Sequence, residues 1–182
     1  GCHSLLVSTD GDLYVTGYNS DGQIGMGDSS TIHIWTKTDR TGVVAVAAGS
    51  YHSLCLDAAG SLFACGANLY GELGQGDTTT RKQWFLTFPQ SIPKAIALGN
   101  YFSWIRVANG TVICSGNNDY GQLGRGDNEH VYDWSTLSAF DSVKQIATGE
   151  THTILLDKNN DIWVAGTERS PGFFHNTFIR QQ

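Results

Sequence analysis

Histidines recur at matched positions along the chain and are the first side chains that could do chemistry. His3, His52 and His152 occupy equivalent places in a pattern that repeats every 49 or 50 residues. Three imidazoles could bind zinc, but zinc needs its nitrogens at about 2 Å, whereas neighbouring packed sheets lie roughly 10 Å apart. Phe102, which cannot bind a metal, occupies the same place in the third copy. We therefore expect no metal site, and we expect each histidine to bond to loop or strand backbone.

Aspartates recur in the same way. Asp28, Asp77 and Asp127 are also one copy apart, so the same objection to a shared metal site applies to them. We expect their carboxylates to accept backbone N–H bonds within loops. The sequence has no G-x-S-x-G elbow and no phosphate-binding loop that leads into a helix. We expect no catalytic residue and no cofactor.

The cysteines are also better explained as structural residues than as reactive ones. Cys2, Cys55, Cys65 and Cys114 have no CxxC spacing. Cys55 and Cys114 stand where the other copies carry aliphatic residues, so both are interpreted as small core residues. We expect reduced structural thiols, and a disulfide or redox role is the alternative.

A repeated pair of strands must position these residues. In each copy an apolar run is followed by a turn and then by a second apolar run that ends at glycine. The turns are Asp10-Gly11, Ala59-Gly60, Asn109-Gly110 and Asn159-Asn160, and the closing glycines are Gly17, Gly66, Gly116 and Gly166. Asp-Gly and Asn-Gly favour the positive φ angles of a two-residue hairpin loop, so the two runs should pair as antiparallel strands.

A glycine-rich loop follows in the first three copies. Its shared residues are Asn19, Gly22, Gly25, Gly27 and Asp28, then Asn68, Gly71, Gly74, Gly76 and Asp77, then Asn118, Gly121, Gly124, Gly126 and Asp127. Three glycines within six residues cannot continue a strand. We predict a compact structural loop whose one apolar residue (Ile24, Leu73 or Leu123) points inward.

The pattern N-x-x-G-Q/E-L/I-G-x-G-D, with G-x-x-H-S/T and this period, resembles the repeats of the regulator of chromosome condensation. The resemblance implies an all-β fold of β-propeller blades, here an incomplete arc of a roughly seven-bladed ring. Residues 1–182 would form one propeller segment, with repeats near 1–48, 49–98, 99–148 and a degenerate 149–182. Because the first copy begins inside a repeat, we expect a strand from upstream sequence or from a partner to precede His3 in its sheet.

Aromatic residues recur beyond the loops. Trp35, Trp84 and Trp134 each follow the loop aspartate by seven residues, where the family more often carries proline. We expect wedges between adjacent blades, and an aromatic ladder facing a ligand is the alternative. The fourth copy lacks the glycine loop, and three phenylalanines of its tail are expected to cover the last exposed blade. They are Phe173, Phe174 and Phe178.

Composition narrows the choice of partner. The formal net charge is −6, and the closest basic cluster is Arg81-Lys82, so direct binding of nucleic acid is not expected. No apolar run approaches the roughly 20 residues of a membrane span, and we expect an intracellular protein, cytoplasmic or nuclear. We predict a non-enzymatic protein–protein interaction scaffold within a larger protein or assembly. Its contacts would lie in variable loops at 29–43, 78–94 and 128–142 and at the open blade ends.

Two other functions follow from the resemblance. Founders of the family exchange nucleotide on the small GTPase Ran through a β-hairpin insertion, so a GTPase regulator is the alternative, although no such insertion is visible here. Plant ultraviolet-B photoreceptors share the repeat and are recognised by Gly-Trp-Arg-His-Thr runs. This chain has Gly49-Ser-Tyr-His-Ser, Gly99-Asn-Tyr-Phe-Ser and Gly149-Glu-Thr-His-Thr at those places, so that signature is absent.

Overall fold

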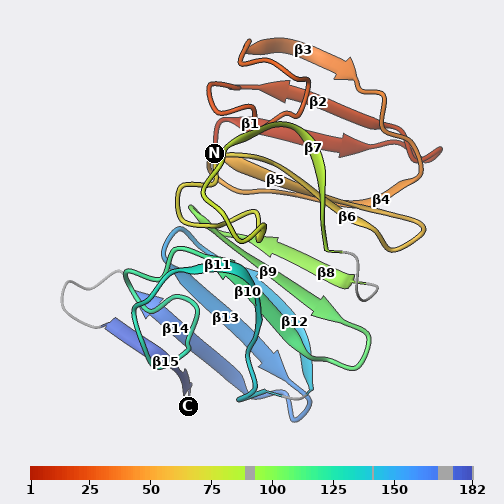
Figure 1. Ribbon diagram of the computed structural model, residues 1–182. Helices are drawn as coiled ribbons and strands as arrows, with labels where there is room; N and C mark the ends of the chain where they lie inside the picture. Colours follow the sequence, from red (N-terminus) through yellow and green to blue (C-terminus); the bar gives the residue numbers. More distant parts are fainter. Residues whose placement is uncertain (89–92, 141, 168–173, 182) are drawn as a thin grey trace.

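The computed structural model describes residues 1–88, 93–140, 142–167 and 174–181, and these form strands and no α-helix (Figure 1). The strands make four antiparallel sheets, one after another along the chain, which we call blades 1 to 4. Blade 1 contains β1 (His3–Val7), β2 (Leu13–Gly17) and β3 (Ile32–Lys37). Blade 2 contains β4 (Val43–Ala48), β5 (His52–Asp57), β6 (Leu62–Gly66) and β7 (Arg81–Phe88). Blade 3 contains β8 (Pro93–Leu98), β9 (Phe102–Val107), β10 (Val112–Gly116) and β11 (Val131–Thr136). Blade 4 contains β12 (Val143–Thr148), β13 (His152–Asp157), β14 (Ile162–Thr167) and β15 (Phe174–Arg180).

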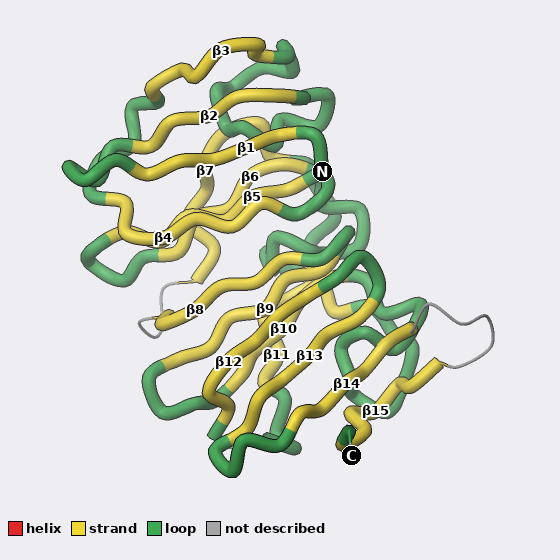
Figure 2. Tube along the Cα trace, turned by 180° about the vertical axis from the view of Figure 1, so that it is seen from behind, coloured by secondary structure: helices red, strands yellow, loops and turns green. Residues whose placement is uncertain are grey.

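The predicted all-β fold of propeller blades is confirmed. Sheets follow one another around an arc, and the first strands of consecutive blades, β4, β8 and β12, lie side by side (Figures 1 and 2). Sequence repeats and blades are offset by one strand. Each repeat supplies three strands of one blade, and its last strand opens the next blade. Blade 1 therefore has three strands within the described residues, and β1 has no partner on the side where β5 pairs with β4.

The hairpin turns differ from the prediction. Ser8 N donates to Asp12 O at 3.0 Å, and Gly11 N donates to Ser8 O at 3.0 Å, which closes a three-residue loop rather than a two-residue one. Only the third loop residue has positive φ, +81° at Gly11, as expected of a type I turn followed by a bulge. The other three turns repeat this geometry, and in the last of them Asn160 adopts φ +69° without being glycine. The Asp-Gly signal predicted the hairpins correctly but not their loop length.

The apolar core lies between blades. Along β5, Leu54 and Leu56 pack against blade 3, whereas Cys55 packs against blade 1, because successive strand residues point to opposite faces. All three side chains are buried. Each described blade interface therefore takes apolar residues from both neighbours, and a blade without a neighbour keeps one apolar face open.

Candidate functional site

The glycine loops are closed by an asparagine that bonds in three directions. In the second loop, Asn68 Nδ2 donates to Asp77 O at 2.9 Å and to Asp77 Oδ1 at 3.0 Å. Asn68 Oδ1 accepts the N–H of Leu73 at 2.9 Å, and Asp77 Oδ1 accepts the N–H of Thr79 at 2.8 Å. The first and third loops repeat these bonds. The aspartates therefore accept backbone N–H bonds as the sequence indicated, and each loop is a fixed part of the framework.

The apolar residue of each loop is fully buried, as predicted. Ile24, Leu73 and Leu123 have no exposed surface. The following glycine has a role that the sequence did not reveal: a Cβ at Gly74 would overlap the indole of Trp134, which comes from the next blade. The pair Gly25 and Trp84 is arranged in the same way. The predicted wedges between blades are confirmed at Trp84 and Trp134.

The tail of the fourth copy supplies one more wedge. A Cβ at Gly124 would overlap the ring of Phe178, and that ring lies 6.2 Å from the Trp104 ring. Phe178 therefore packs between blades 3 and 4, and the expectation that it covers the last exposed blade is wrong. Phe173 and the side chain of Phe174 lie outside the described residues.

The histidines join blades through serine. His3 Nε2 lies 2.8 Å from Ser53 Oγ, and that hydroxyl donates to the carbonyl of Gln23 at 2.7 Å. His52 and Ser103 repeat the contact at 2.9 Å, and Ser103 donates to the carbonyl of Glu72. For His3 and His52 the expectation of a bond to backbone is therefore wrong, since the partner is a hydroxyl on the next blade and only that hydroxyl reaches backbone.

Blade 3 keeps this link without a histidine. Phe102 cannot donate a hydrogen bond, but Trp104, two residues further along the same strand, donates from Nε1 to Thr153 Oγ1 at 3.0 Å. Thr153 then donates to the carbonyl of Gln122 at 2.8 Å. The link between blades is therefore preserved by a different side chain, which supports a structural role for His3 and His52.

Titration of the buried groups agrees with that role. Burial lowers the pKa of His3 to about 4 and that of His52 to about 3, so both imidazoles are neutral at physiological pH. Burial raises the pKa of the Cys55 and Cys114 thiols to about 12, which suits core residues rather than nucleophiles. The described residues bring together no group of three His, Cys, Asp or Glu side chains with the geometry of a metal site.

The first blade exposes positions that the second blade buries. Leu6 and Trp35 are 46% and 49% exposed, whereas their counterparts Cys55 and Trp84 are 0% and 9% exposed. The difference arises because blade 1 covers the second pair and nothing in the described chain covers the first. At the other end of the arc Ile162 is 47% exposed, whereas its counterpart Leu62 is fully buried. Within the described part of the chain, both end faces of the segment are therefore apolar and open.

The segments expected to be variable loops are partly strands. Residues 29–43, 78–94 and 128–142 contain β3, β7 and β11, the outer strands of their blades. The wedge residues Trp84 and Trp134 tie β7 and β11 to the preceding blades, whereas Trp35 on β3 is half exposed. The residues free to vary are thus fewer than the sequence suggested, and they lie at the strand ends.

An array of aromatic rings that the sequence analysis missed joins blades 2 and 3. The Tyr51 and Tyr101 rings stack with centroids 5.1 Å apart and planes 12° apart. Tyr70 lies 5.3 Å from Tyr101 and 4.9 Å from His130, and His130 lies 6.3 Å from Tyr132. We call these five residues the tyrosine array. One signal was available, since Tyr51 and Tyr101 occupy the same place in their copies.

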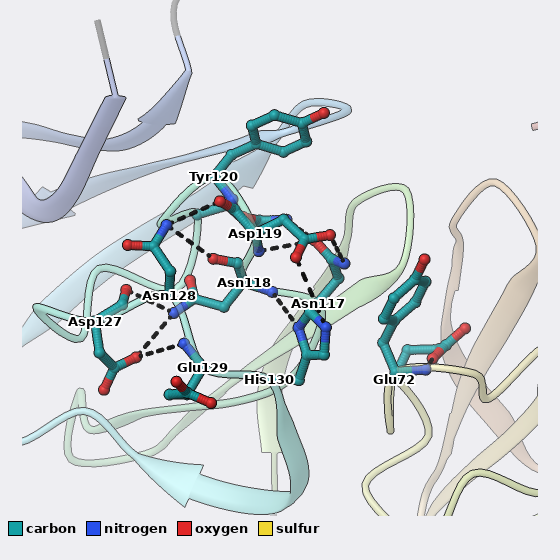
Figure 3. A network of polar contacts seen from close by, with 11 residues as sticks. Glu72, Asn117, Asn118, Asp119, Tyr120, Asp127, Asn128, Glu129 and His130 are labelled. Carbon is teal, nitrogen blue, oxygen red and sulfur yellow. Dashed lines mark hydrogen bonds and ion pairs between the residues drawn. The ribbon is translucent and has the colours of Figure 1, made fainter.

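A polar network holds one end of the array (Figure 3). His130 Nε2 lies 3.7 Å from Asp119 Oδ1, and the backbone N–H of Asn118 donates to His130 Nδ1 at 3.3 Å. Asp119 Oδ2 accepts from Asn117 Nδ2 at 2.8 Å, and its carbonyl accepts from Asn128 Nδ2 at 2.8 Å. The Asp119 side chain is half exposed, so this carboxylate is fixed in place yet open to solvent.

Glu72 stands where the other loops have glutamine. Gln122 Nε2 donates to Asn117 Oδ1 at 2.6 Å, but Ala67 occupies the place of Asn117 in the second loop and offers no partner. Glu72 Oε2 accepts the N–H of Tyr70 at 2.8 Å, while Oε1 is buried without a partner among the described residues. Burial is the main reason that the pKa of Glu72 rises to about 7.

Comparison with known families and structures agrees with this geometry. Two models of the regulator of chromosome condensation (RCC1) repeat match the chain, one at residues 10–56 and 109–156 and the other at 43–72 and 94–122. No curated protein sequence matches significantly. No described segment forms a helix that could cross a membrane.

Solved structures share the fold. Human WBSCR16 is 24% identical with a TM-score of 0.84, over 98% of this chain and 49% of that one. Prp20p from Saccharomyces cerevisiae, whose binding properties to Gsp1p and histones are described, is 18% identical with a TM-score of 0.85, over 98% and 48%. Yeast RCC1 (Prp20), solved bound to Kap60, is 18% identical with a TM-score of 0.84, and the match covers 98% of this chain and 46% of that one. The chain thus spans about half the length of each of these structures.

Proposed function

Because this chain belongs to the family of regulator of chromosome condensation repeats, we propose that it works as a non-enzymatic protein–protein interaction scaffold, as one arc of a larger propeller. The observation that carries the proposal is the contrast between Trp35 and Trp84. The same wedge residue is 49% exposed at the end of the arc and 9% exposed inside it. Exposed apolar faces of this kind are sites of protein contact.

The interior interfaces indicate what the end faces accept. Trp84 covers Gly25, Trp134 covers Gly74 and Phe178 covers Gly124, so Trp35 should cover the glycine of an equivalent loop on a preceding blade. The open edge of β1 should receive a strand like β4. Both needs are met by further repeat blades, supplied by the same protein or by a partner.

The likeness to Prp20p extends to the fold, at 18% identity, so the binding of Gsp1p or histones stays a property of Prp20p. For this chain we propose protein contacts in general, made by the end faces and by the face that carries the glycine loops. The interlocked hydrogen bonds between blades would keep these surfaces rigid.

Photo-crosslinking in the full-length native protein tests the proposal. Benzoylphenylalanine replaces Trp35 or Ile162, and Ile34, which is 75% exposed beside Trp35, serves as the control position. Benzoylphenylalanine at position 35 should yield an adduct that mass spectrometry maps to a glycine loop of another blade. Position 162 should also yield a polypeptide adduct, and position 34 should not map to such a loop. Absence of polypeptide adducts at both 35 and 162 would overturn the proposal.

A further inference from the structure

The loop face of the arc carries a continuous aromatic surface. We define the loop face as the end of the blades that bears segments 18–31, 67–80 and 117–130 and the short turns 49–51, 99–101 and 149–151. The tyrosine array runs across this face from blade 2 to blade 3. The same face also carries Leu69, Tyr18 and Tyr120, which are 64%, 44% and 41% exposed. Aromatic and apolar groups are therefore presented to solvent on a rigid part of the fold.

Charge is distributed unequally between the loop face and the opposite end of the blades. We call that end the hairpin face because it bears the four hairpin turns. In the described residues, the half of the molecule nearer the loop face carries nine acidic residues and three basic ones. These are Asp21, Asp28, Glu72, Asp77, Asp119, Asp127, Glu129, Asp133 and Glu150, with Arg81, Lys82 and Arg125. The half nearer the hairpin face is close to balanced. It carries Asp10, Asp12, Asp39, Asp57, Asp157 and Asp161, with Lys37, Arg40, Lys94, Arg106, Lys144, Lys158 and Arg180.

Two of the three basic side chains of the loop face lie close to loop aspartates, and the third, Lys82, lies against Gly22. Arg81 pairs with Asp77 at 2.7 Å, and Arg125 lies 3.9 Å from Asp127. The excess negative charge therefore falls on other residues around the tyrosine array. Asp21 is close enough to contribute to the raised pKa of Tyr101, which burial, chiefly, brings to about 12. Asp119 anchors the opposite end of the array through His130.

Glu72 adds an independent sign of a cationic ligand. Glu72 Oε2 accepts the backbone N–H of Tyr70, so the carboxyl group lies next to a member of the array. Its side chain is fully buried, and Oε1 has no partner among the described residues. A buried carboxyl group with one oxygen unpartnered is costly to ionise, and a positive charge held above it would stabilise the ionised form. Asp21 also acts on Glu72, which joins the two acids electrostatically.

We propose that the tyrosine array and the carboxylates of Asp21, Asp119 and Glu150 bind an arginine-rich basic segment of a partner protein. This inference rests on the proposed scaffold function and names the class of its partner. Guanidinium groups stack on tyrosine faces and bond to carboxylates in the same contact, whereas lysine offers a compact, strongly hydrated charge. Nucleic acid would be repelled by the same surface.

Fluorescence anisotropy with a labelled peptide of alternating arginine and serine tests the inference on the full-length protein. Two comparison peptides carry lysine or glutamate in place of arginine. The arginine peptide should bind roughly tenfold more tightly than the lysine peptide, and its binding should weaken at high ionic strength. Equal binding of the arginine and glutamate peptides would overturn the inference.

Matched variants separate the loop face from net charge. Asp21→Asn with Glu150→Gln should weaken binding of the arginine peptide at least tenfold, whereas Asp10→Asn with Asp39→Asn, which removes the same charge from the hairpin face, should leave it nearly unchanged. Tyr70→Leu should abolish the preference for arginine over lysine. Equal weakening by both pairs would contradict the inference. Crosslinks from positions 35 and 162 without peptide binding would overturn this inference alone and leave the scaffold proposal standing.

Discussion

Blades 1 and 2 carry matching residues on the face that points toward the N-terminal end of the arc. On blade 2 this face is buried against blade 1, whereas on blade 1 it is exposed. Trp84 packs on Gly25 and on the Ile24 cluster of blade 1, whereas Trp35, at the matching place, faces solvent. A residue of the repeat thus becomes part of the core only when a neighbouring blade covers it. Stability in such an array is therefore shared between blades and their interfaces.

The largest expected difference in stability is between alanine variants of Trp84 and Trp35. Trp84→Ala should lower the free energy of unfolding by about 3 to 5 kcal/mol, because it empties a filled space between blades. Trp35→Ala in the same chain should cost less than about 1 kcal/mol, because its ring is half exposed. Urea unfolding followed by circular dichroism measures both. Equal losses would show that burial by the neighbouring blade is not what makes the wedge matter.

Two leucines of one loop sharpen the comparison. Leu73 is fully buried and Leu69 is 64% exposed. Leu73→Ala should destabilise by about 2 to 4 kcal/mol, as expected for a large-to-small change in a packed core, whereas Leu69→Ala should stay within about 0.5 kcal/mol of the parent. The measurement is the urea midpoint at constant slope. A near-neutral Leu73 variant would mean that the loop is solvated.

Two glycines of that loop separate backbone strain from contact with the next blade. Gly74 and Gly76 have φ of +65° and +72°, but a Cβ at Gly74 would overlap Trp134, whereas one at Gly76 would meet nothing within 4 Å. Gly76→Ala should cost about 1 kcal/mol for positive φ alone, and Gly74→Ala should cost at least about 2 kcal/mol because of overpacking as well. Thermal melts compare the two variants. Equal losses of stability would show that contact with the neighbouring blade does not contribute to the cost at Gly74.

The last expected effect concerns Glu72 and depends on pH. Its pKa, about 7 in the fold against an ordinary 4.5, means that the folded state holds the proton more tightly than the unfolded chain. Stability from this group is therefore fully present below pH 4.5 and is lost as pH rises through about 7. Glu72→Gln should stabilise by about 1 to 3 kcal/mol at alkaline pH and by little in acid.

Thermal melts across pH 5 to 8 measure this difference, and Gln122→Glu is the matched control in the third loop. That variant replaces an amide that donates to Asn117 Oδ1 with a carboxyl group, so it should be less stable than the parent at pH 8 and should recover toward pH 5. A Glu72→Gln difference that does not change with pH would contradict the titration of a buried carboxyl group.

Local signals in the sequence were sufficient to predict the blades. The closing bonds of Asn68 and Asp77 and the buried Leu73 lie within one loop, so the residue pattern specifies them directly. The contact of His3 with Ser53 could not be predicted in this way, because it joins residues 50 positions apart on different sheets. The bond that Trp104 makes to Thr153, in place of a histidine bond in the third copy, could not be predicted for the same reason.

The surfaces were predicted less completely than the framework. Phe178 looked like a cap because its copy lacks the glycine loop, yet β15 still pairs with β14 and places that ring between blades. The tyrosine array depends on the arc bringing Tyr51, Tyr70 and Tyr101 together from two blades, and no single repeat contains all three. Spacing along the chain indicates which residues share a face, but not which faces meet.

The most direct test of the central claim, that both ends of this arc are docking faces, is size-exclusion chromatography with light scattering on the 182-residue chain, with a hydrophobic dye added in parallel. Open apolar end faces should give associated species or strong dye binding. Both should be reduced when Trp35→Ser and Ile162→Ser are combined, because the exposed apolar area at the ends then falls. A monodisperse monomer of 19.7 kDa that binds no dye would contradict the central claim.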